Sequence, residues 1–242
     1  MTTALDTPAA PARDRIVSVM RVHTHYRTLA FAWPLGILAV IVGITWAVLS
    51  LVPDGSMSIK TGGATFVFIF GLTLFAQILT QVFPFTLGLG VTRREFFAAT
   101  VAVAVVHALI FGIGLFALSL VESATDGFGV RMQTFSLATP LAGSAAIELF
   151  FLIAAFLMCN LIGMLAGAIY VRWRVTGIWT AVLAEAVLIG AVIFVVTWQG
   201  WWGAVIETVA DAPRLLTMVL LPLLVASAAG LGTRVILRRT TA

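Results

Sequence analysis

The chain has 242 residues, of which 61% are hydrophobic and only 10% are charged, and its formal net charge is +4. A soluble domain has about a quarter of its residues charged, so this composition excludes an ordinary soluble enzyme, a nucleic-acid-binding protein and a disordered chain. We therefore expect a protein that lies in a membrane, with the lipid bilayer as its main partner.

Residues 1–28 are polar and contain no short apolar core with a cleavage site, so they predict a cytoplasmic segment and no removable signal peptide. Within this segment, residues 13–28 place Ile16, Val19 and Met20 at helical spacing, with most arginines on other faces. The pattern predicts a short amphipathic helix on the inner leaflet. Such a helix either transmits movement between cytoplasm and membrane or simply anchors the chain.

A helix needs about 20 apolar residues to cross the hydrocarbon region of a bilayer. Six stretches qualify: Leu29–Val52, Thr65–Gly90, Phe97–Val121, Gly143–Tyr170, Gly177–Gln199 and Leu215–Ile236. Pro84, near the end of the second stretch, predicts a kink or a break there. We expect an all-α fold with a six-helix transmembrane domain over residues 29–236 and a cytoplasmic tail over residues 237–242.

The basic residues fall mainly on one side of these six spans. Eleven of the fourteen lie at the N-terminus, in the second and fourth loops and at the C-terminus, whereas Lys60, Arg131 and Arg214 lie in the other loops. Because Lys and Arg accumulate in cytoplasmic loops, both termini are predicted to be cytoplasmic.

The loop between the second and third spans reads GLGVTRREFF from Gly88 to Phe97. Thr92 and Glu95 have the spacing of a capping box, which predicts a short helical turn with Arg93 and Arg94 facing the cytoplasm. Such a turn is either a docking surface for another protein or only a signal that fixes the topology.

The Gly-x-(Ser/Thr)-Arg-Arg-x-Phe-Phe pattern in this position resembles bacterial ABC transporter permeases of the type-2 exporter class. The resemblance covers about ten residues as sequence and nearly the whole chain as architecture. It implies that this chain spans the bacterial plasma membrane several times as the permease subunit of an ATP-driven exporter. It also implies a coupling turn that contacts the ATPase and is formed by Gly90, Thr92, Arg93, Arg94, Glu95 and Phe96.

No GxxxxGK[ST] phosphate loop is present, so this chain is not expected to be an enzyme or to bind a cofactor. ATP and Mg²⁺ would belong to a separate ABC ATPase subunit. By the same resemblance, six spans form half of a translocation pathway, which implies a second permease copy, identical or similar. The apolar interior and short loops favour an amphipathic cargo such as a drug, peptide or lipid.

Several polar residues lie within the predicted spans, where they are candidates for function. The second span has a polar face formed by Thr73, Gln77, Thr80 and Gln81. This face could line a pathway or bond another helix, and the resemblance favours lining. Glu185 of the fifth span is a further candidate for lining the pathway. His107 lies at a depth similar to that of Glu185 and could bond it if the two spans touch. Glu148 is expected to extend outward or to line an outer vestibule.

Other features are interpreted as structural. Asn160, Gly163 and Gly167 on span four, like Ala226 and Gly230 on span six, offer small-residue stripes for close helix packing. The third outer loop, Thr197–Pro213, either forms a short re-entrant helix, as in the resembled family, or places Trp198, Trp201 and Trp202 in an ordinary aromatic belt. No Cys/His cluster predicts a metal site.

Two other functions fit the same composition. One is a proton-coupled secondary transporter with Glu185 and His107 as proton carriers, and the other is a membrane scaffold or sensor that transports nothing.

Overall fold

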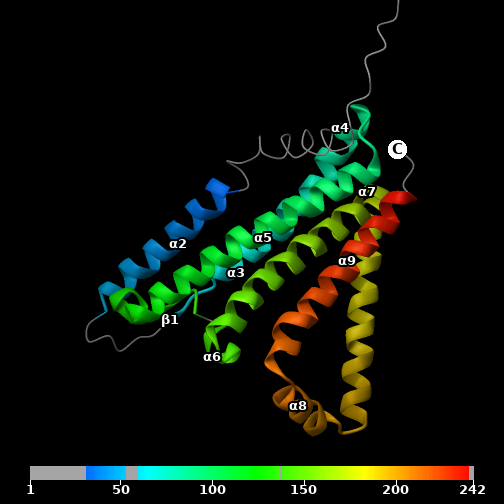
Figure 1. The fold of residues 1–242 in the computed structure, drawn as a ribbon. Helices are drawn as coiled ribbons and strands as arrows, with labels where there is room; N and C mark the ends of the chain where they lie inside the picture. Colours follow the sequence, from blue (N-terminus) through cyan, green and yellow to red (C-terminus); the bar gives the residue numbers. More distant parts are fainter. Residues whose placement is uncertain (1–30, 53–58, 137, 240–242) are drawn as a thin grey trace, which may run out of the picture.

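The structure is a computed structural model that describes residues 31–52, 59–136 and 138–239. The described chain is almost entirely helical (Figure 1). Its helices are α2 (Trp33–Ser50), α3 (Gly63–Gln77), α4 (Phe83–Gly88), α5 (Arg93–Ala124), α6 (Thr139–Ala142), α7 (Ala145–Trp198), α8 (Trp202–Asp211) and α9 (Leu221–Arg238), with wider π-turns η3 (Ile78–Val82), η4 (Gly127–Arg131) and η5 (Leu216–Leu220). The amphipathic helix predicted over residues 13–28 lies outside the described residues.

Five helical stretches of the described chain are long and apolar enough to cross a membrane. The protein is therefore a multi-pass, all-α membrane protein. The stretches coincide with the apolar segments expected from the sequence, except that the fourth and fifth segments are joined in the 54-residue α7. Within α7, Arg174 has φ 57° and ψ −151°, which is not helical, so the chain changes direction there.

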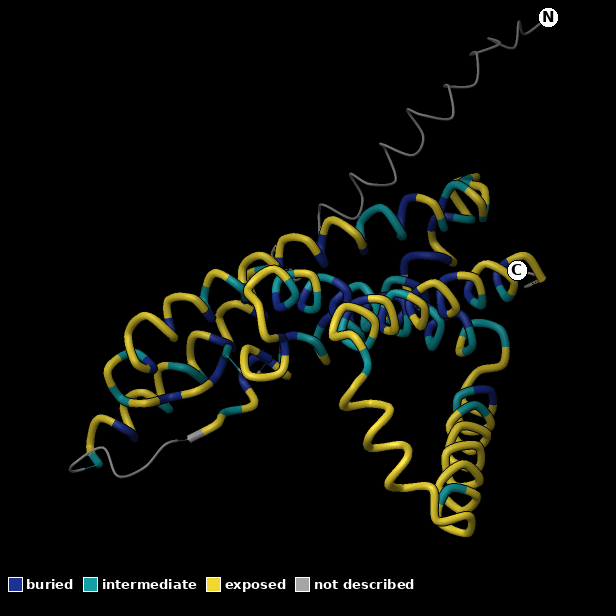
Figure 2. The backbone as a smooth tube through the Cα atoms, turned by 60° about the horizontal axis from the view of Figure 1, so that its bottom comes forward, coloured by how far each residue is buried: buried dark blue, intermediate teal, exposed yellow. Residues whose placement is uncertain are grey.

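The bend at Arg174 divides α7 into a first half, residues 145–173, and a second half, residues 175–198. The two halves diverge, and α8 connects the far end of the second half to the start of η5 and α9 (Figure 1). Nearly every residue of the second half beyond the bend is exposed, whereas the first half is largely buried or half-buried (Figure 2).

The first half of α7 is the central helix of the bundle, in contact with α3, α5 and α9. Its contact with α3 depends on Gly163, because a Cβ at this position would lie 2.1 Å from the carbonyl oxygen of Leu72. Gly167, one turn further on, approaches Ala76 and Leu79 in the same way. The predicted small-residue stripe of span four therefore packs closely, and its neighbour is α3.

The second apolar segment is formed by α3, η3 and α4 in succession. A kink or break near Pro84 was the expectation, and the structure places the π-turn η3 directly before it, with Pro84 in the first turn of α4. Proline lacks an N–H and cannot donate within a helix interior. The wider turn lets the helix continue without that hydrogen bond.

The end of the bundle that carries β1 is held by a short parallel strand pair and a buried carboxylate. β1 (Ile59–Lys60) pairs with β2 (Met132–Gln133). Glu122, 1% exposed, lies in the last turns of α5 and accepts hydrogen bonds from the backbone N–H groups of Thr134, Phe135 and Ser136 at 2.8, 2.9 and 3.0 Å. The Ser136 hydroxyl donates to the same carboxylate. Glu122 therefore fixes the path of the chain after β2.

Candidate functional site

Arginine side chains gather at one end of the bundle. The α4–α5 turn, the bend of α7 and the C-terminus of α9 all lie there (Figure 1), and they carry Arg93, Arg94, Arg172, Arg174, Arg234, Arg238 and Arg239. Among the described residues of these three segments, Glu95 is the single acidic one. This end, which we call the basic end, therefore has a strongly positive surface.

The α4–α5 turn is rigidly built at the basic end. Gly90 has φ +81°, a left-handed conformation that glycine adopts without strain. Thr92 is the N-cap of α5: its hydroxyl oxygen accepts from the backbone N–H of Glu95 at 3.3 Å, while the Glu95 carboxylate accepts from the backbone N–H of Thr92 at 2.9 Å. The predicted capping box is thereby confirmed.

Of the six residues of the expected coupling turn, three are exposed, one is buried, and Arg93 and Glu95 are half-buried. Gly90, Thr92 and Arg94 are exposed and could be touched by another protein. Phe96 is completely buried and packs against Phe83 with their ring centroids 5.1 Å apart. It can anchor the turn to the bundle but cannot itself contact a partner in this conformation.

Arg93 has a second structural role that the sequence did not indicate. Its Nη1 donates to the carbonyl oxygens of Leu237 and Arg238 at 3.3 and 3.5 Å. These are carbonyls of the last turn of α9, which have no partner within the helix. Arg93 thus ties the start of α5 to the end of α9, and it is half-buried in doing so.

A polar stripe follows the exposed side of α3 and η3. Thr73, Gln77 and Gln81 are exposed and Thr80 is half-buried. The hydroxyl groups donate to carbonyl oxygens of the same segment, Thr73 to Ile69 and Thr80 to Gln77. The two glutamine amides lie on the surface of the described bundle, at the π-turn.

His107 and Asn160 form a buried polar pair between α5 and α7. Asn160 Nδ2 donates to the carbonyl oxygen of Ala104 at 3.1 Å and lies 3.2 Å from His107 Nδ1. His107 Nε2 and Asn160 Oδ1 are buried without a hydrogen-bond partner in the described part of the chain. A Cβ on Gly71 would lie 2.8 Å from that amide oxygen, so α3 closes over the pair.

The hydrogen bond considered between His107 and Glu185 is not formed. His107 is 2% exposed and bonds Asn160, whereas Glu185 is exposed on the second half of α7. The bend at Arg174 carries Glu185 away from α5. The depth of a residue in the membrane, when it is counted along a straight helix, does not reveal such a bend.

Glu148 also differs from expectation. It is 3% exposed and its Oε1 accepts from the hydroxyl of Thr139 at 2.8 Å. The side chain therefore joins the short helix α6 to the first turn of α7 and does not extend outward. Arg214, just before η5, donates from Nη1 to the carbonyl oxygen of Leu141 and holds α6 from its other side.

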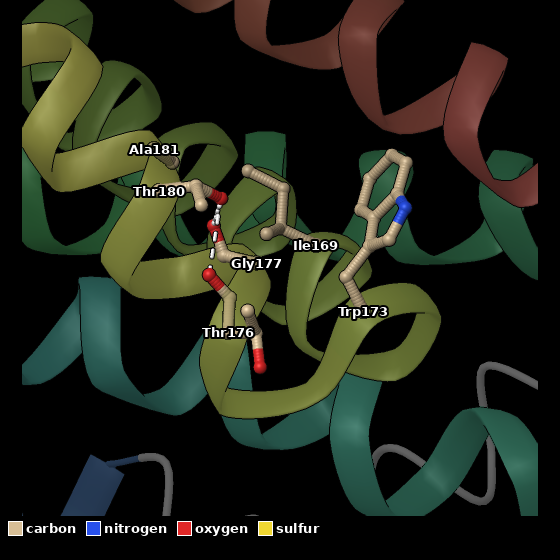
Figure 3. Close-up of a pocket in the computed structure, with 6 residues that line it drawn as sticks. All are labelled: Ile169, Trp173, Thr176, Gly177, Thr180 and Ala181. Atoms are coloured by element: carbon tan, nitrogen blue, oxygen red, sulfur yellow. Dashed lines mark hydrogen bonds between the residues drawn. The ribbon is translucent and has the colours of Figure 1, made fainter.

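An open, mostly apolar pocket of about 440 Å³ lies at the bend of α7 and is shown in Figure 3. The Thr180 hydroxyl donates to the carbonyl oxygens of Thr176 and Gly177, both at 3.0 Å. Gly177 allows the Trp173 side chain to lie close to the backbone of the next turn, because a Cβ at position 177 would lie 2.5 Å from the Cβ of Trp173. The pocket is a product of the hinge between the two halves of α7.

The short helix considered for the third outer loop is present as α8, which is fully exposed along its length. Trp202 Nε1 donates to the Thr197 hydroxyl at 3.1 Å and connects α8 to the end of α7. In the described part of the chain, no three His, Cys, Asp or Glu side chains come together as metal ligands.

Comparison of the chain with models of protein families, with curated proteins and with solved structures finds no match. The fold and the surface together define this protein as a multi-pass helical membrane protein with one strongly basic end.

Proposed function

We propose that this chain is the membrane-spanning permease subunit of an ATP-driven ABC exporter and forms half of its translocation pathway. The observation that carries the proposal is the rigid, exposed α4–α5 turn at the basic end. Its capping box and the buried Phe96 fix it to the bundle, so a force applied at Thr92 or Arg94 reaches α5 without being absorbed by a flexible loop.

In this proposal the protein has six spans with both termini in the cytoplasm of a bacterial cell. The break at Arg174 supports six spans, because each half of α7 exceeds the roughly 20 residues that one crossing needs. The arginines of the basic end support the orientation, since arginine is enriched on the cytoplasmic side. The basic end is then the face that an ATPase subunit approaches from the cytoplasm.

A second permease copy is expected to cover polar groups that the described bundle leaves exposed. Gln77 and Gln81 would each present an amide to hydrocarbon, where an amide without a partner costs several kcal/mol. Glu185 on the exposed second half of α7 would cost about 3 kcal/mol as a charged group at the bilayer centre. A water-filled path between two copies removes both costs and makes these side chains its lining.

The chain itself performs no covalent chemistry in this proposal. ATP and Mg²⁺ are bound by the partner ATPase, and hydrolysis is converted into movement of α5 relative to the rest of the bundle. The cargo is an amphipathic or hydrophobic compound, which the largely apolar surface of the spans favours.

The proposal is tested by reversing one charge on the turn. Arg94→Glu is the sharpest variant, because Arg94 is exposed while Arg93 also holds α9. Lys60→Glu, at the opposite end, is the control with the same charge change. The affinity-tagged chain is purified from its native membrane in mild detergent, and ATP hydrolysis in the eluate is measured.

ATPase activity is expected to co-purify with the wild-type chain and with Lys60→Glu. Arg94→Glu should retain at most about a tenth of that activity, because its carboxylate would face the acidic ATPase surface that the basic end is proposed to bind, and like charges across an interface cost several kcal/mol. Equal ATPase activity with all three proteins contradicts docking at the turn. An eluate without ATPase activity from the wild type contradicts the proposed function itself.

A further inference from the structure

A groove between α5 and α9 opens at the basic end. Its volume is about 500 Å³, within the usual range for small-molecule sites. Four arginines, two from the start of α5 and two from the end of α9, form its rim, and no carboxylate lines it among the described residues. The groove therefore attracts a negatively charged group.

The floor of the groove is apolar and continues into the membrane-spanning part of α5. Arg94, Ala98, Val101 and Ala102 recur at helical spacing, so they lie on one face of the helix, which leads from Arg94 at the rim to the apolar floor. From Arg93 to Ala102 this face descends about 13 Å. A ligand that fills the groove must be anionic at the top and apolar below.

The arginines stand at two levels. Arg234 precedes Arg238 by one helical turn, so it lies about 6 Å deeper along α9. Both are exposed, and long arginine side chains near a helix end extend toward the headgroup region. Arg93 is already bonded to the α9 carbonyls, which keeps the two walls of the groove together and leaves the other three guanidinium groups for a ligand.

We propose that this groove binds an anionic phospholipid of the inner leaflet. The phosphate and headgroup lie among Arg94, Arg234 and Arg238, and one acyl chain lies along Phe97 and Val101. A soluble acidic peptide could satisfy the rim, but the floor is reached from within the hydrocarbon region, which favours a lipid. The lipid would tie α5 to α9 next to the α4–α5 turn.

This inference requires that the chain spans a membrane with its basic end on the cytoplasmic side, and it does not depend on an ATPase partner. Its charge variants are placed on α9, away from Arg94, so that failure of lipid binding and failure of ATPase docking are separate results.

The test measures lipid selectivity of the full chain. The protein is reconstituted with equimolar phosphatidylglycerol and phosphatidylcholine and extracted in mild detergent, and the retained lipids are quantified by mass spectrometry. The key variant is Arg234→Gln with Arg238→Gln. The matched control is Arg172→Gln with Arg174→Gln, which removes the same charge from the basic end outside the groove.

The wild type and the control are expected to retain phosphatidylglycerol in preference to phosphatidylcholine. Each arginine near an anionic lipid contributes about a fivefold preference, so the key variant should lose most of the selectivity. Ala98→Trp fills the floor without changing charge, and it should also reduce the retained phosphatidylglycerol. Circular dichroism and gel filtration check that every variant is folded.

Three results overturn the proposal. One is equal retention of both lipids by the wild type, and another is unchanged selectivity in the key variant. The third is displacement of phosphatidylglycerol by glycerol 3-phosphate or by a glutamate-rich peptide at equal concentration, which would show that a phosphate or an acidic protein segment is the ligand and that the apolar floor is not used.

Discussion

Replacing Arg174 by glycine is expected to stabilise the protein, although it removes a charged side chain and adds the most flexible residue. Arg174 has φ 57° and ψ −151° in the middle of α7. This region of backbone space is populated almost solely by glycine. The arginine is exposed at the bend, so its side chain contributes little packing that glycine would lose.

The magnitude follows from two opposing terms. A non-glycine residue in such a conformation costs about 1–3 kcal/mol. Glycine costs about 0.5–1 kcal/mol in additional backbone entropy on folding. The net gain is about 1 kcal/mol, which in a protein of this size raises the midpoint of thermal unfolding by about 2–4 °C.

Two controls give the opposite sign. Arg172→Gly removes an equivalent arginine from a helical position, where glycine costs about 1 kcal/mol, and it also removes the stacking of Arg172 on Trp173 at 4.7 Å. Gly177→Ala places a Cβ 2.5 Å from that of Trp173, and overpacking of this kind costs about 1–3 kcal/mol.

Thermal unfolding in detergent, followed by intrinsic fluorescence, measures all three variants. Arg174→Gly should unfold above the wild type, and both controls below it. If Arg174→Gly is destabilised as much as Arg172→Gly, position 174 is helical in solution and α7 does not bend there. In that case the interpretation of α7 as two spans is wrong.

Three further predictions concern other parts of the bundle. Glu122→Gln should lower the free energy of unfolding by about 3 kcal/mol, because an amide cannot accept the full set of charge-assisted hydrogen bonds. Denaturant unfolding measures this change, and an unchanged stability would contradict the conclusion that Glu122 fixes the path of the chain after β2. Gly163→Ala should lower the thermal unfolding midpoint, since its Cβ meets the Leu72 carbonyl at 2.1 Å, and a stability within about 0.5 kcal/mol of the wild type would contradict the close α3–α7 contact. The third prediction concerns access of water to Gln77 and is made in a chain whose Cys159 is replaced by alanine. Gln77→Cys should react with a water-soluble maleimide, whereas Ile110→Cys, exposed on apolar α5, should not. Equal protection of the two cysteines would place Gln77 in lipid or protein and not in a water-filled path.

The positions of the helices could be predicted because apolar length and helix-capping residues are local properties. Thr92 and Glu95 determine the start of α5 by their own hydrogen bonds. The predicted third span began at Phe97, after the charged Arg93 and Arg94, yet the capping box lies before these arginines and stabilises the first helical turn outside the apolar stretch. The helix therefore begins at Arg93, before its apolar stretch.

The positions of the buried polar groups could not be predicted in the same way, because they depend on contacts between distant segments. In the sequence, Glu122 is simply an acidic residue at the end of an apolar segment, and its three backbone donors come from residues 134–136. The sole local signal was a carboxylate in the last turn of an apolar helix. His107 could be recognised as buried, but its partner Asn160 is 53 residues away.

Arg174 shows a third limit of sequence interpretation. An arginine pair between two apolar segments correctly indicated a change of direction, but a loop was expected and the structure has a single non-helical residue. Backbone conformation at one residue depends on the packing of both halves, here on the close approach allowed by Gly177. Composition does not contain that information.

Photo-crosslinking from position 94 tests most directly whether the α4–α5 turn is the contact through which an ATPase drives this protein. A benzophenone side chain replaces Arg94 in the full chain, and a second protein carries it at Lys60 as a control. After irradiation in the native membrane, position 94 should form an adduct with a protein that has a phosphate loop and hydrolyses ATP, while position 60 should not. If the phosphate-loop ATPase is captured at position 60 and not at position 94, or at neither position, the turn is not the site of coupling and the account is contradicted.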